Sequence, residues 1–265
     1  MKRPHYIPII IVFTAVTLFL ILFTLYIICP MFYKKTDLSS TDYYIAHAGG
    51  IIDGHTYTNS LEAVLLSIQK GYKYIELDLQ LTTDSQLVCM HSIEDYRKMT
   101  NTPDSIDISF RIFKKNKIYG RYTPLSAKEL SSIIMKYNIT LVTDKISDPV
   151  ILDRNFSKVR NHVIVEAFSL HDYQELKKLG YRPMLNIRSE GIKRNYIKKC
   201  IENNCLINCI STSATNDDIM NYRILKKIFG VKIITYSPKD PILLKNNIGR
   251  EIDMIYIDDK DIMRH

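Results

Sequence analysis

Short apolar runs alternate with amphipathic segments from residue 43 to residue 259. Each run has the length and the Ile, Val, Leu and Tyr content of a single strand. We expect eight strands, at Tyr43–Ala48, Tyr74–Thr82, Thr140–Lys145, His162–Ser169, Arg182–Arg188, Asn208–Ser213, Lys232–Pro238 and Met254–Asp259.

The segments between these runs have the spacing of helices, and glycines stand where several of them should end. The predicted helices include Ser60–Lys70, Ala127–Tyr137, Asp172–Leu179, Ile192–Asn203 and Asp217–Phe229, and the glycines are Gly71, Gly180 and Gly230. Strand and helix repeated eight times indicate an α/β fold of the (β/α)8 type, a TIM barrel. An open, doubly wound sheet is the alternative.

Two segments depart from this rhythm. Leu87–His91 has the pattern of a short strand, and the turn at Asp84 and Ser85 predicts a hairpin with the end of the second strand. Thr100–Tyr122 is polar and without a clear period, which predicts an insertion over one mouth of the barrel.

The chain from Tyr6 to Cys29 contains no charged residue and is long enough to cross a bilayer as a helix. Its end is bulky, without the small residues of a cleavage site, which favours an uncleaved signal anchor over a signal peptide. We therefore expect a membrane protein anchored through residues 6–29, with the barrel outside the cytoplasm. The expected domains are an N-terminal tail and anchor at 1–33, a linker at 34–41 and the barrel at 42–265.

Charge and composition exclude several partners. No G-x-G-x-x-G or Walker-type run occurs, so no nucleotide cofactor is expected. The net charge of the chain is +8. Half of it comes from the four cationic residues that flank the anchor, and residues 36–265 carry only +4. A nucleic-acid-binding protein normally concentrates its basic residues in a patch, so no nucleic-acid partner is expected.

In a barrel of this type, the residues that do chemistry lie at the carboxyl ends of the strands. Glu76 and Asp78 are two apart on one strand, so their side chains leave the same face. Desolvated like charges repel, and a divalent cation relieves that repulsion. Asp144 adds a third oxygen from the next strand, a ligand set that suits Mg²⁺ or Ca²⁺.

Two histidines flank these carboxylates at strand ends. His47 follows the first strand and His91 ends the predicted hairpin. A pair of imidazoles suits proton transfer, one removing a proton from a nucleophile and the other donating one to a leaving oxygen. His47 as base and His91 as acid is our assignment, and the reverse remains open.

Four motifs in this region resemble the glycerophosphodiester phosphodiesterase family, whose relatives include phosphatidylinositol-specific phospholipase C. They are I-A-H-A-G-G at residues 45–50, T-N-S-L-E-A-V at Thr58–Val64, Y-I-E-L-D-L-Q-L-T-T-D at Tyr74–Asp84 and L-V-C-M-H at Leu87–His91. The resemblance implies a barrel, a divalent cation and cleavage of a phosphodiester by two histidines. It makes His47 and His91 the acid/base pair, and Glu76, Asp78 and Asp144 the metal carboxylates.

The chain departs from the family pattern at several positions. The family has arginine at Ala48, an acidic residue at Thr58 and aspartate at Ser92, and this last change is expected to leave His91 less well oriented. The Glu-x-Lys of the third strand is Asp144-Lys145, which shifts the lysine by one residue and predicts that it points to the other face.

Two cations are candidates for binding the substrate phosphate. They are Lys145, despite its shift, and Arg188 at the end of the fifth strand, which is able to replace the missing arginine. Glu166 is also near a strand end, where we expect a structural ion pair.

These observations favour a membrane-anchored, metal-dependent phosphoric diester hydrolase of lipid metabolism. Its expected substrates are glycerophosphodiesters, lipid headgroups or a phosphodiester-linked surface polymer. The alternatives are a degenerate barrel that binds such ligands without cleaving them, and an accessory protein of an envelope complex.

Overall fold

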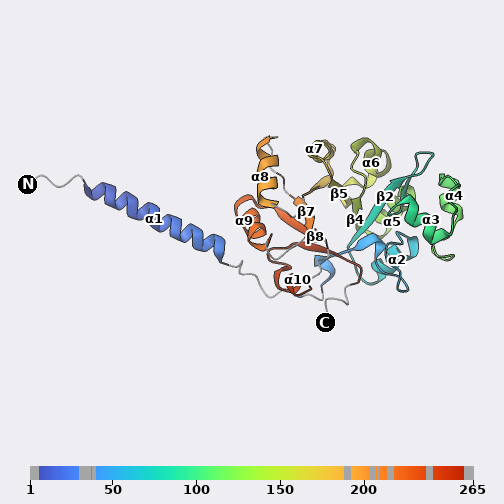
Figure 1. Ribbon diagram of the computed structural model, residues 1–265, viewed down its shortest axis with the longest axis horizontal. Coiled ribbons are helices and arrows are strands. Elements are labelled where there is room, and N and C mark those ends of the chain that lie inside the picture. The colour runs from blue at the N-terminus through green and yellow to red at the C-terminus, as the bar shows by residue number, and fades with distance from the viewer. Residues whose placement is uncertain are drawn as a thin grey trace, which may run out of the picture.

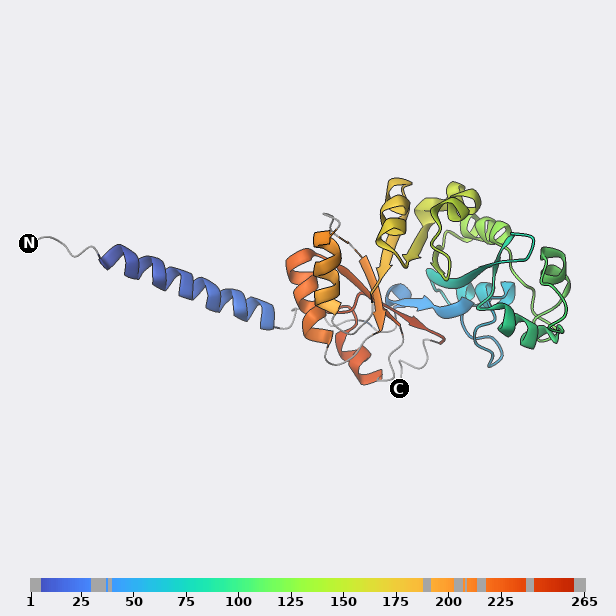
Figure 2. The same cartoon turned by 45° about the horizontal axis from the view of Figure 1, so that its top comes forward.

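Parallel strands of the chain close into a barrel. The computed structural model describes residues 6–29, 37, 40–187, 192–202, 207, 209–213, 218–236 and 241–259. Within these ranges eight strands pair in the order β1-β2-β4-β5-β6-β7-β8-β9, and β9 pairs with β1 (Figure 1 and Figure 2). They are β1 (Tyr44–Ala46), β2 (Tyr74–Leu81), β4 (Thr140–Asp144), β5 (Val163–Ala167), β6 (Arg182–Asn186), β7 (Cys209–Ser213), β8 (Lys232–Tyr236) and β9 (Met254–Ile257). The predicted (β/α)8 barrel is confirmed.

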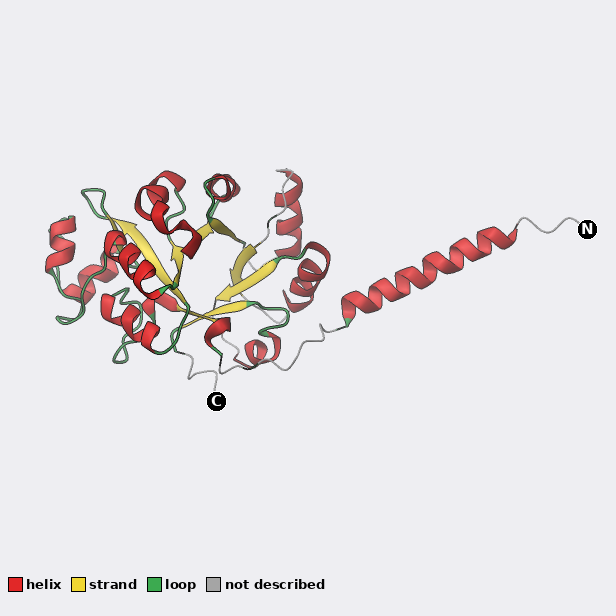
Figure 3. Ribbon diagram, turned by 180° about the vertical axis from the view of Figure 1, so that it is seen from behind, coloured by secondary structure: helices red, strands yellow, loops and turns green. Residues whose placement is uncertain are grey.

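Helices surround the strands on the outside of the barrel (Figure 3). The predicted helices are α2 (Leu61–Gln69), α5 (Ala127–Tyr137), α7 (Leu170–Lys178), α8 (Ile192–Glu202) and α9 (Ile219–Phe229). Two further helices, α6 (Pro149–Phe156) and α10 (Pro241–Asn247), are too short to show a clear period. Gly71, Gly180 and Gly230 have φ angles of 87°, 87° and 66°, the left-handed backbone that ends a helix.

The interior of the barrel is filled in layers. Ile45, Val142, Met184 and Ile234 form an apolar cluster with Tyr256, and these four come from alternate strands of the barrel. Such a layer of four is typical of this fold. Because side chains two residues apart share a face of a strand, the next inward position on each of these strands lies one layer nearer the carboxyl end.

The segment between β2 and β4 folds against its own small core. β3 (Leu87–Cys89) pairs antiparallel with the end of β2, which confirms the predicted hairpin. Two helices follow, α3 (Ile93–Thr100) and α4 (Phe110–Lys115). Phe113 of α4 is fully buried in a second apolar cluster that includes Tyr96 of α3. Thr100–Tyr122 is therefore not an irregular polar segment: it contains α4, and its apolar residues pack on β3 and α3. Its place over one mouth of the barrel stays a prediction.

The N-terminal helix α1 (Tyr6–Ile28) projects away from the barrel, and its carboxyl end meets α9 (Figure 1). Lys227 of α9 donates hydrogen bonds to the carbonyl oxygens of Tyr26 and Cys29. The stretch Ile11–Ile28 has a mean hydropathy of 2.7 and none of it is buried, so by length and composition it is able to cross a membrane. The boundaries at 33 and 41 stay predictions, since residues 30–36, 38 and 39 lie outside the described chain.

Candidate active site

Polar residues stand above the apolar layer of the barrel. Two residues beyond Ile45, Val142, Met184 and Ile234 come His47, Asp144, Asn186 and Tyr236. His47, Asp144, Asn186 and Tyr236 all line a cavity of about 520 Å³. The rest of its lining comes from Tyr57, Asp78, His91, Lys145 and Phe168. The strand period that builds the core thus also places the polar residues at the carboxyl mouth of the barrel.

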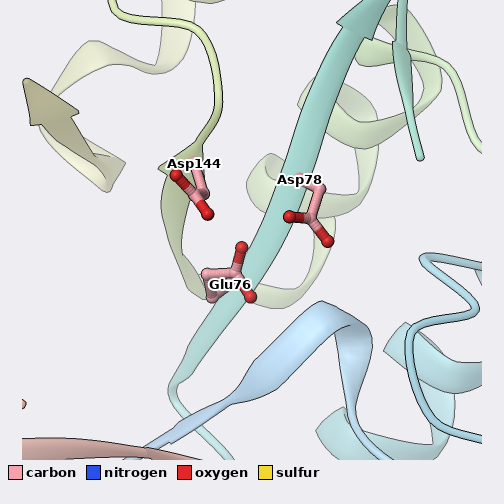
Figure 4. Close-up of side chains that lie close together, drawn as sticks. All are labelled: Glu76, Asp78 and Asp144. Carbon is pink, nitrogen blue, oxygen red and sulfur yellow. The ribbon is translucent and has the colours of Figure 1, made fainter. Parts of the chain in front are cut away.

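Three carboxylates converge beneath this cavity. Figure 4 shows Glu76 and Asp78 on β2 facing Asp144 at the end of β4, and one oxygen of each lies within 4.8 Å of the others. Glu76 and Asp78 are each only 2% exposed. The arrangement follows from the strand register, because Asp78 pairs directly with Asp144.

The electrostatics of this cluster are unfavourable without a cation. Burial, followed by the charge of Asp78, raises the pKa of Glu76 well above its ordinary value. Burial also raises the pKa of Asp78, although Asn59 donates a hydrogen bond of 2.9 Å to its Oδ2. Glu76 Oε2 accepts a hydrogen bond of 2.7 Å from the backbone N–H of Ala48, whereas its Oε1 is buried without a partner among the described residues. An orphaned oxygen facing two further carboxylates fits a divalent cation.

Lys145 lies inside the site, contrary to the expectation from its shifted position. Its Nζ is 3.8 Å from Asp78 Oδ1 and 3.6 Å from Asp144 Oδ2. The backbone at Lys145 is left-handed, with φ at 71°, so the strand alternation that predicted the other face no longer holds there. Burial lowers the pKa of Lys145, but the charges of Asp144 and Asp78 outweigh burial and raise it. The lysine is therefore a cation at the mouth of the site.

Each histidine is held by a carboxylate through its Nδ1. His47 Nδ1 lies 2.9 Å from Asp258 Oδ1, and His91 Nδ1 lies 2.7 Å from Asp95 Oδ2. The hydroxyl of Ser92 donates to the same oxygen of Asp95 at 2.7 Å. The expectation that Ser92 leaves His91 poorly oriented is wrong, because Asp95, one helical turn further along α3, provides the carboxylate.

The remaining substrate-binding candidate, Arg188, lies outside the described residues. Ala48, at the position of the family's arginine, is buried with a left-handed φ of 48°. It contributes its backbone N–H to Glu76 and no side-chain cation. Among the described residues that line the cavity, Lys145 is the only lysine or arginine.

Glu166 of β5 anchors the far wall of the cavity. Its Oε1 accepts hydrogen bonds from Asn186 Nδ2 at 2.7 Å, from Ser211 Oγ at 2.5 Å and from the hydroxyl of Tyr236. These donors are all neutral, so the predicted structural ion pair is wrong. Burial, followed by the charge of Asp144, raises the pKa of Glu166 to about 7.

We expect Glu166→Gln to stabilise the fold above neutral pH. A carboxyl whose folded-state pKa is raised contributes stability that is complete below its ordinary value of 4.5 and is lost as pH rises through about 7. The amide keeps an oxygen for the three donors and carries no charge. Denaturant unfolding in chelator should show a gain on the order of a few kcal/mol at about pH 8 and little gain at about pH 4.5. If the stabilities of the wild type and of Glu166→Gln changed with pH in the same way, the raised pKa of Glu166 would be contradicted.

We expect Asp95→Asn to lower kcat for phosphodiester hydrolysis by about 10- to 1,000-fold with a smaller change in KM, because His91 loses the carboxylate that orients it. Ser92→Ala is the matched control. It removes the cap of α3 and costs about 1 kcal/mol of stability, but the contact between His91 and Asp95 remains. Steady-state kinetics of both variants measure the effect. An equal loss of kcat in both would show that Asp95 has only a structural role.

Comparison with known proteins agrees with this site. The sequence profile of the glycerophosphoryl diester phosphodiesterase family matches residues 49–205, which is more than half of the chain. The chain belongs to this family. Membership confirms the resemblance drawn from the sequence and the expected enzyme class, a phosphoric diester hydrolase. No curated protein sequence matches the chain.

Solved structures of other proteins have the same fold as this chain. A phosphodiesterase from Oleispira antarctica, in complex with the product sn-glycerol-3-phosphate, is 18% identical with a TM-score of 0.64, and the match covers 84% of this chain and 95% of that one. A glycerophosphodiester phosphodiesterase from Thermotoga maritima is 20% identical with a TM-score of 0.63, over 84% and 96% of the two chains. A third, from Agrobacterium tumefaciens, is 14% identical with a TM-score of 0.62, over 83% and 98%.

Several residues of the site escaped prediction from the sequence. Asp258 ends the run I-Y-I-D at residues 255–258, but its contact with His47 spans 211 positions and exists only because β9 closes the barrel on β1. Asp95 lies in the first turn of α3, four residues after His91, which immediately precedes the N-cap Ser92; this short spacing was readable in principle. Asn59, which supports Asp78, belongs to the quoted motif T-N-S.

Proposed function

We propose that the chain is a membrane-anchored, metal-dependent phosphodiesterase that cleaves glycerophosphodiesters or related lipid or polymer phosphodiesters by histidine acid/base catalysis. The observation that carries the proposal is that Glu76, Asp78 and Asp144 converge at a cavity that His47 and His91 also line. Family membership supports the reaction class.

Glu76, Asp78 and Asp144 are the residues that would hold a divalent cation, Mg²⁺ or Ca²⁺. When bound, such a cation supplies positive charge for the phosphodiester oxygens and for the charge that gathers in the transition state. The buried, unpartnered Oε1 of Glu76 supports this assignment. Lys145 adds a second positive charge at the mouth, where it is able to contact the phosphate.

The two histidines move the protons of the reaction. Asp258 and Asp95 hold the Nδ1 atoms, so the Nε2 atoms are left to exchange protons. His47 takes the proton of the nucleophile, water or a neighbouring substrate hydroxyl, as its oxygen forms the new bond to phosphorus. His91 gives a proton to the oxygen of the departing alcohol as the old bond to phosphorus breaks.

A glycerol phosphate group is the best-supported part of the substrate. The phosphodiesterase from Oleispira antarctica holds sn-glycerol-3-phosphate as its product on the same fold. The cavity of about 520 Å³ has the size of a site for a small molecule. Its lining combines carboxylates and a cation with the rings of Tyr57, Phe168 and Tyr236, which suits the carbons and hydroxyls of a small diester.

Helix α1 is our proposed anchor. Its stretch Ile11–Ile28 is apolar and none of it is buried, which suits a segment surrounded by lipid, and its contact with α9 lies at its carboxyl end. As a signal anchor it holds the short N-terminal tail in the cytoplasm and the barrel outside.

Hydrolysis by the full-length chain in detergent micelles tests the proposal. A glycerophosphodiester such as glycerophosphoglycerol is followed by phosphorus NMR with Mg²⁺, with Ca²⁺ and with chelator. Release of a phosphomonoester that needs the metal supports a phosphodiesterase. Metal-dependent binding of the diester without turnover would instead indicate a degenerate barrel that only binds it, an outcome for which the missing arginine at Ala48 gives the reason.

A further inference from the structure

A second cavity adjoins the candidate active site. It has a volume of about 370 Å³ and is lined by residues of α3, by the loop that contains Tyr57, and by His91 and Tyr119. Tyr57 and His91 line both cavities, and the other residues of the second are Thr56, Asp95, Lys98, Met99 and Tyr119. The two cavities therefore meet at the histidine that we assign as the proton donor.

Tyr57 is the wall that the cavities share. Its ring meets His47 edge-on at 4.7 Å between centroids and His91 at 5.2 Å. Its backbone is left-handed, with φ at 58°, a strained conformation for a large side chain that the surrounding structure must enforce. Tyr57 as a residue is still 40% exposed and lines both cavities, so it remains within reach of a ligand in either one.

The charges of the second cavity favour an anion. Asp95 is engaged by His91 and Ser92, and Lys98 also acts on it electrostatically. When His91 carries the proton it will donate, its charge balances that of Asp95. Lys98 then gives the cavity its net positive charge. No carboxylate among the described residues lies at salt-bridge distance from Lys98. A positive, partly aromatic cavity suits an anionic, polyhydroxylated group.

We propose that the second cavity is the subsite for the leaving alcohol and that it selects alcohols that themselves carry a phosphate. The inference rests on the proposed function, in which His91 protonates the leaving oxygen. That oxygen must lie within hydrogen-bond reach of His91, so the rest of the alcohol extends past the imidazole into the second cavity, which His91 also lines. Lys98 contacts the anionic group there, and Met99 and Tyr119 contact the carbons. A substrate of this kind is a chain of glycerol units joined by phosphodiesters.

A matched pair of substrates tests the subsite on the full-length chain in detergent with the activating metal. One is glycerophosphoglycerol, and the other is the same diester with a terminal phosphate on the leaving glycerol. Lys98→Met is expected to lower kcat/KM for the phosphate-bearing diester by about three- to tenfold, mainly through KM. The loss for glycerophosphoglycerol should stay within about twofold, the size expected where no charge contact is removed.

Two further variants separate charge from packing. Lys98→Arg keeps the charge and should retain the preference for the phosphate-bearing diester. Lys115→Met removes an exposed lysine of α4 that lines neither cavity and should change neither rate. Equal effects of Lys98→Met on both diesters, or no effect on either, would overturn the subsite.

The subsite and the proposed function fail in different ways. Absence of turnover of both diesters would refute the phosphodiesterase activity. Calorimetric binding of the same two diesters to the wild type and to Lys98→Met then decides the subsite. Tighter binding of the phosphate-bearing diester that depends on Lys98 supports it, and equal affinities overturn it.

Discussion

Alanine at His47 or at His91 is expected to lower kcat for hydrolysis of a glycerophosphodiester by about 10²- to 10⁴-fold, the range for loss of a general acid or base. Each imidazole is held through Nδ1 by its own carboxylate, so neither is able to take over the work of the other. Steady-state kinetics with saturating metal measure the loss. His171→Ala, an exposed histidine of α7, is the control and should leave the rate unchanged.

The nature of the leaving group separates the two roles. An aryl phosphodiester releases a stable phenolate and needs little help from an acid, whereas an alkyl diester releases an alkoxide and needs protonation. His91→Ala should therefore lose far less activity on the aryl diester than on the alkyl one, and His47→Ala should lose activity equally on both. The opposite pattern would exchange the roles, and equal losses in all four cases would contradict the acid/base pairing.

Glu76→Gln is expected to abolish metal-dependent turnover and, in chelator, to make the fold more stable than the wild type. The carboxylate is buried beside Asp78 and has one oxygen without a partner, so its charge destabilises the metal-free protein. The glutamine keeps an oxygen for the N–H of Ala48. Removing the like charge should be worth on the order of 1–3 kcal/mol at neutral pH.

The sign of the pH dependence follows from the raised pKa of Glu76. Below its ordinary value of 4.5 the carboxyl is protonated in both the folded and unfolded states, so the variant and the wild type should be equally stable. The gain from Glu76→Gln should grow as pH rises above that value. Thermal unfolding with chelator and with added metal measures it, and Glu202→Gln, at the exposed end of α8, is the control. A wild type that is more stable than Glu76→Gln in chelator would contradict the account.

Local pattern was sufficient for the residues that strand geometry positions. Glu76 and Asp78 are two apart on one strand, and Asp144 pairs with Asp78 in the register of neighbouring parallel strands. His47 follows directly from the end of β1. The period of a strand and the ends of the apolar runs are properties of short segments, and they suffice to bring these side chains to one mouth of the barrel.

Other features depend on information that no short segment contains. The orientation of Lys145 is set by a left-handed backbone that a strand pattern does not indicate. The partner of His47 comes from the last strand, through closure of the barrel. Phe113 is buried by β3 and α3 in a second core, so the polarity of its own segment conceals it. In each case a tertiary contact overrides the local pattern.

A parallel titration of metal binding and turnover tests the central claim most directly. The full-length chain is freed of metal with chelator in detergent, and Mg²⁺ or Ca²⁺ is added in steps while bound metal and hydrolysis of glycerophosphoglycerol are measured on the same sample. We predict that the rate starts at background and rises in proportion to occupancy of one site, and that Glu76→Gln abolishes both. Full turnover in chelator, or a rate that does not change with metal occupancy of the site, would contradict the account.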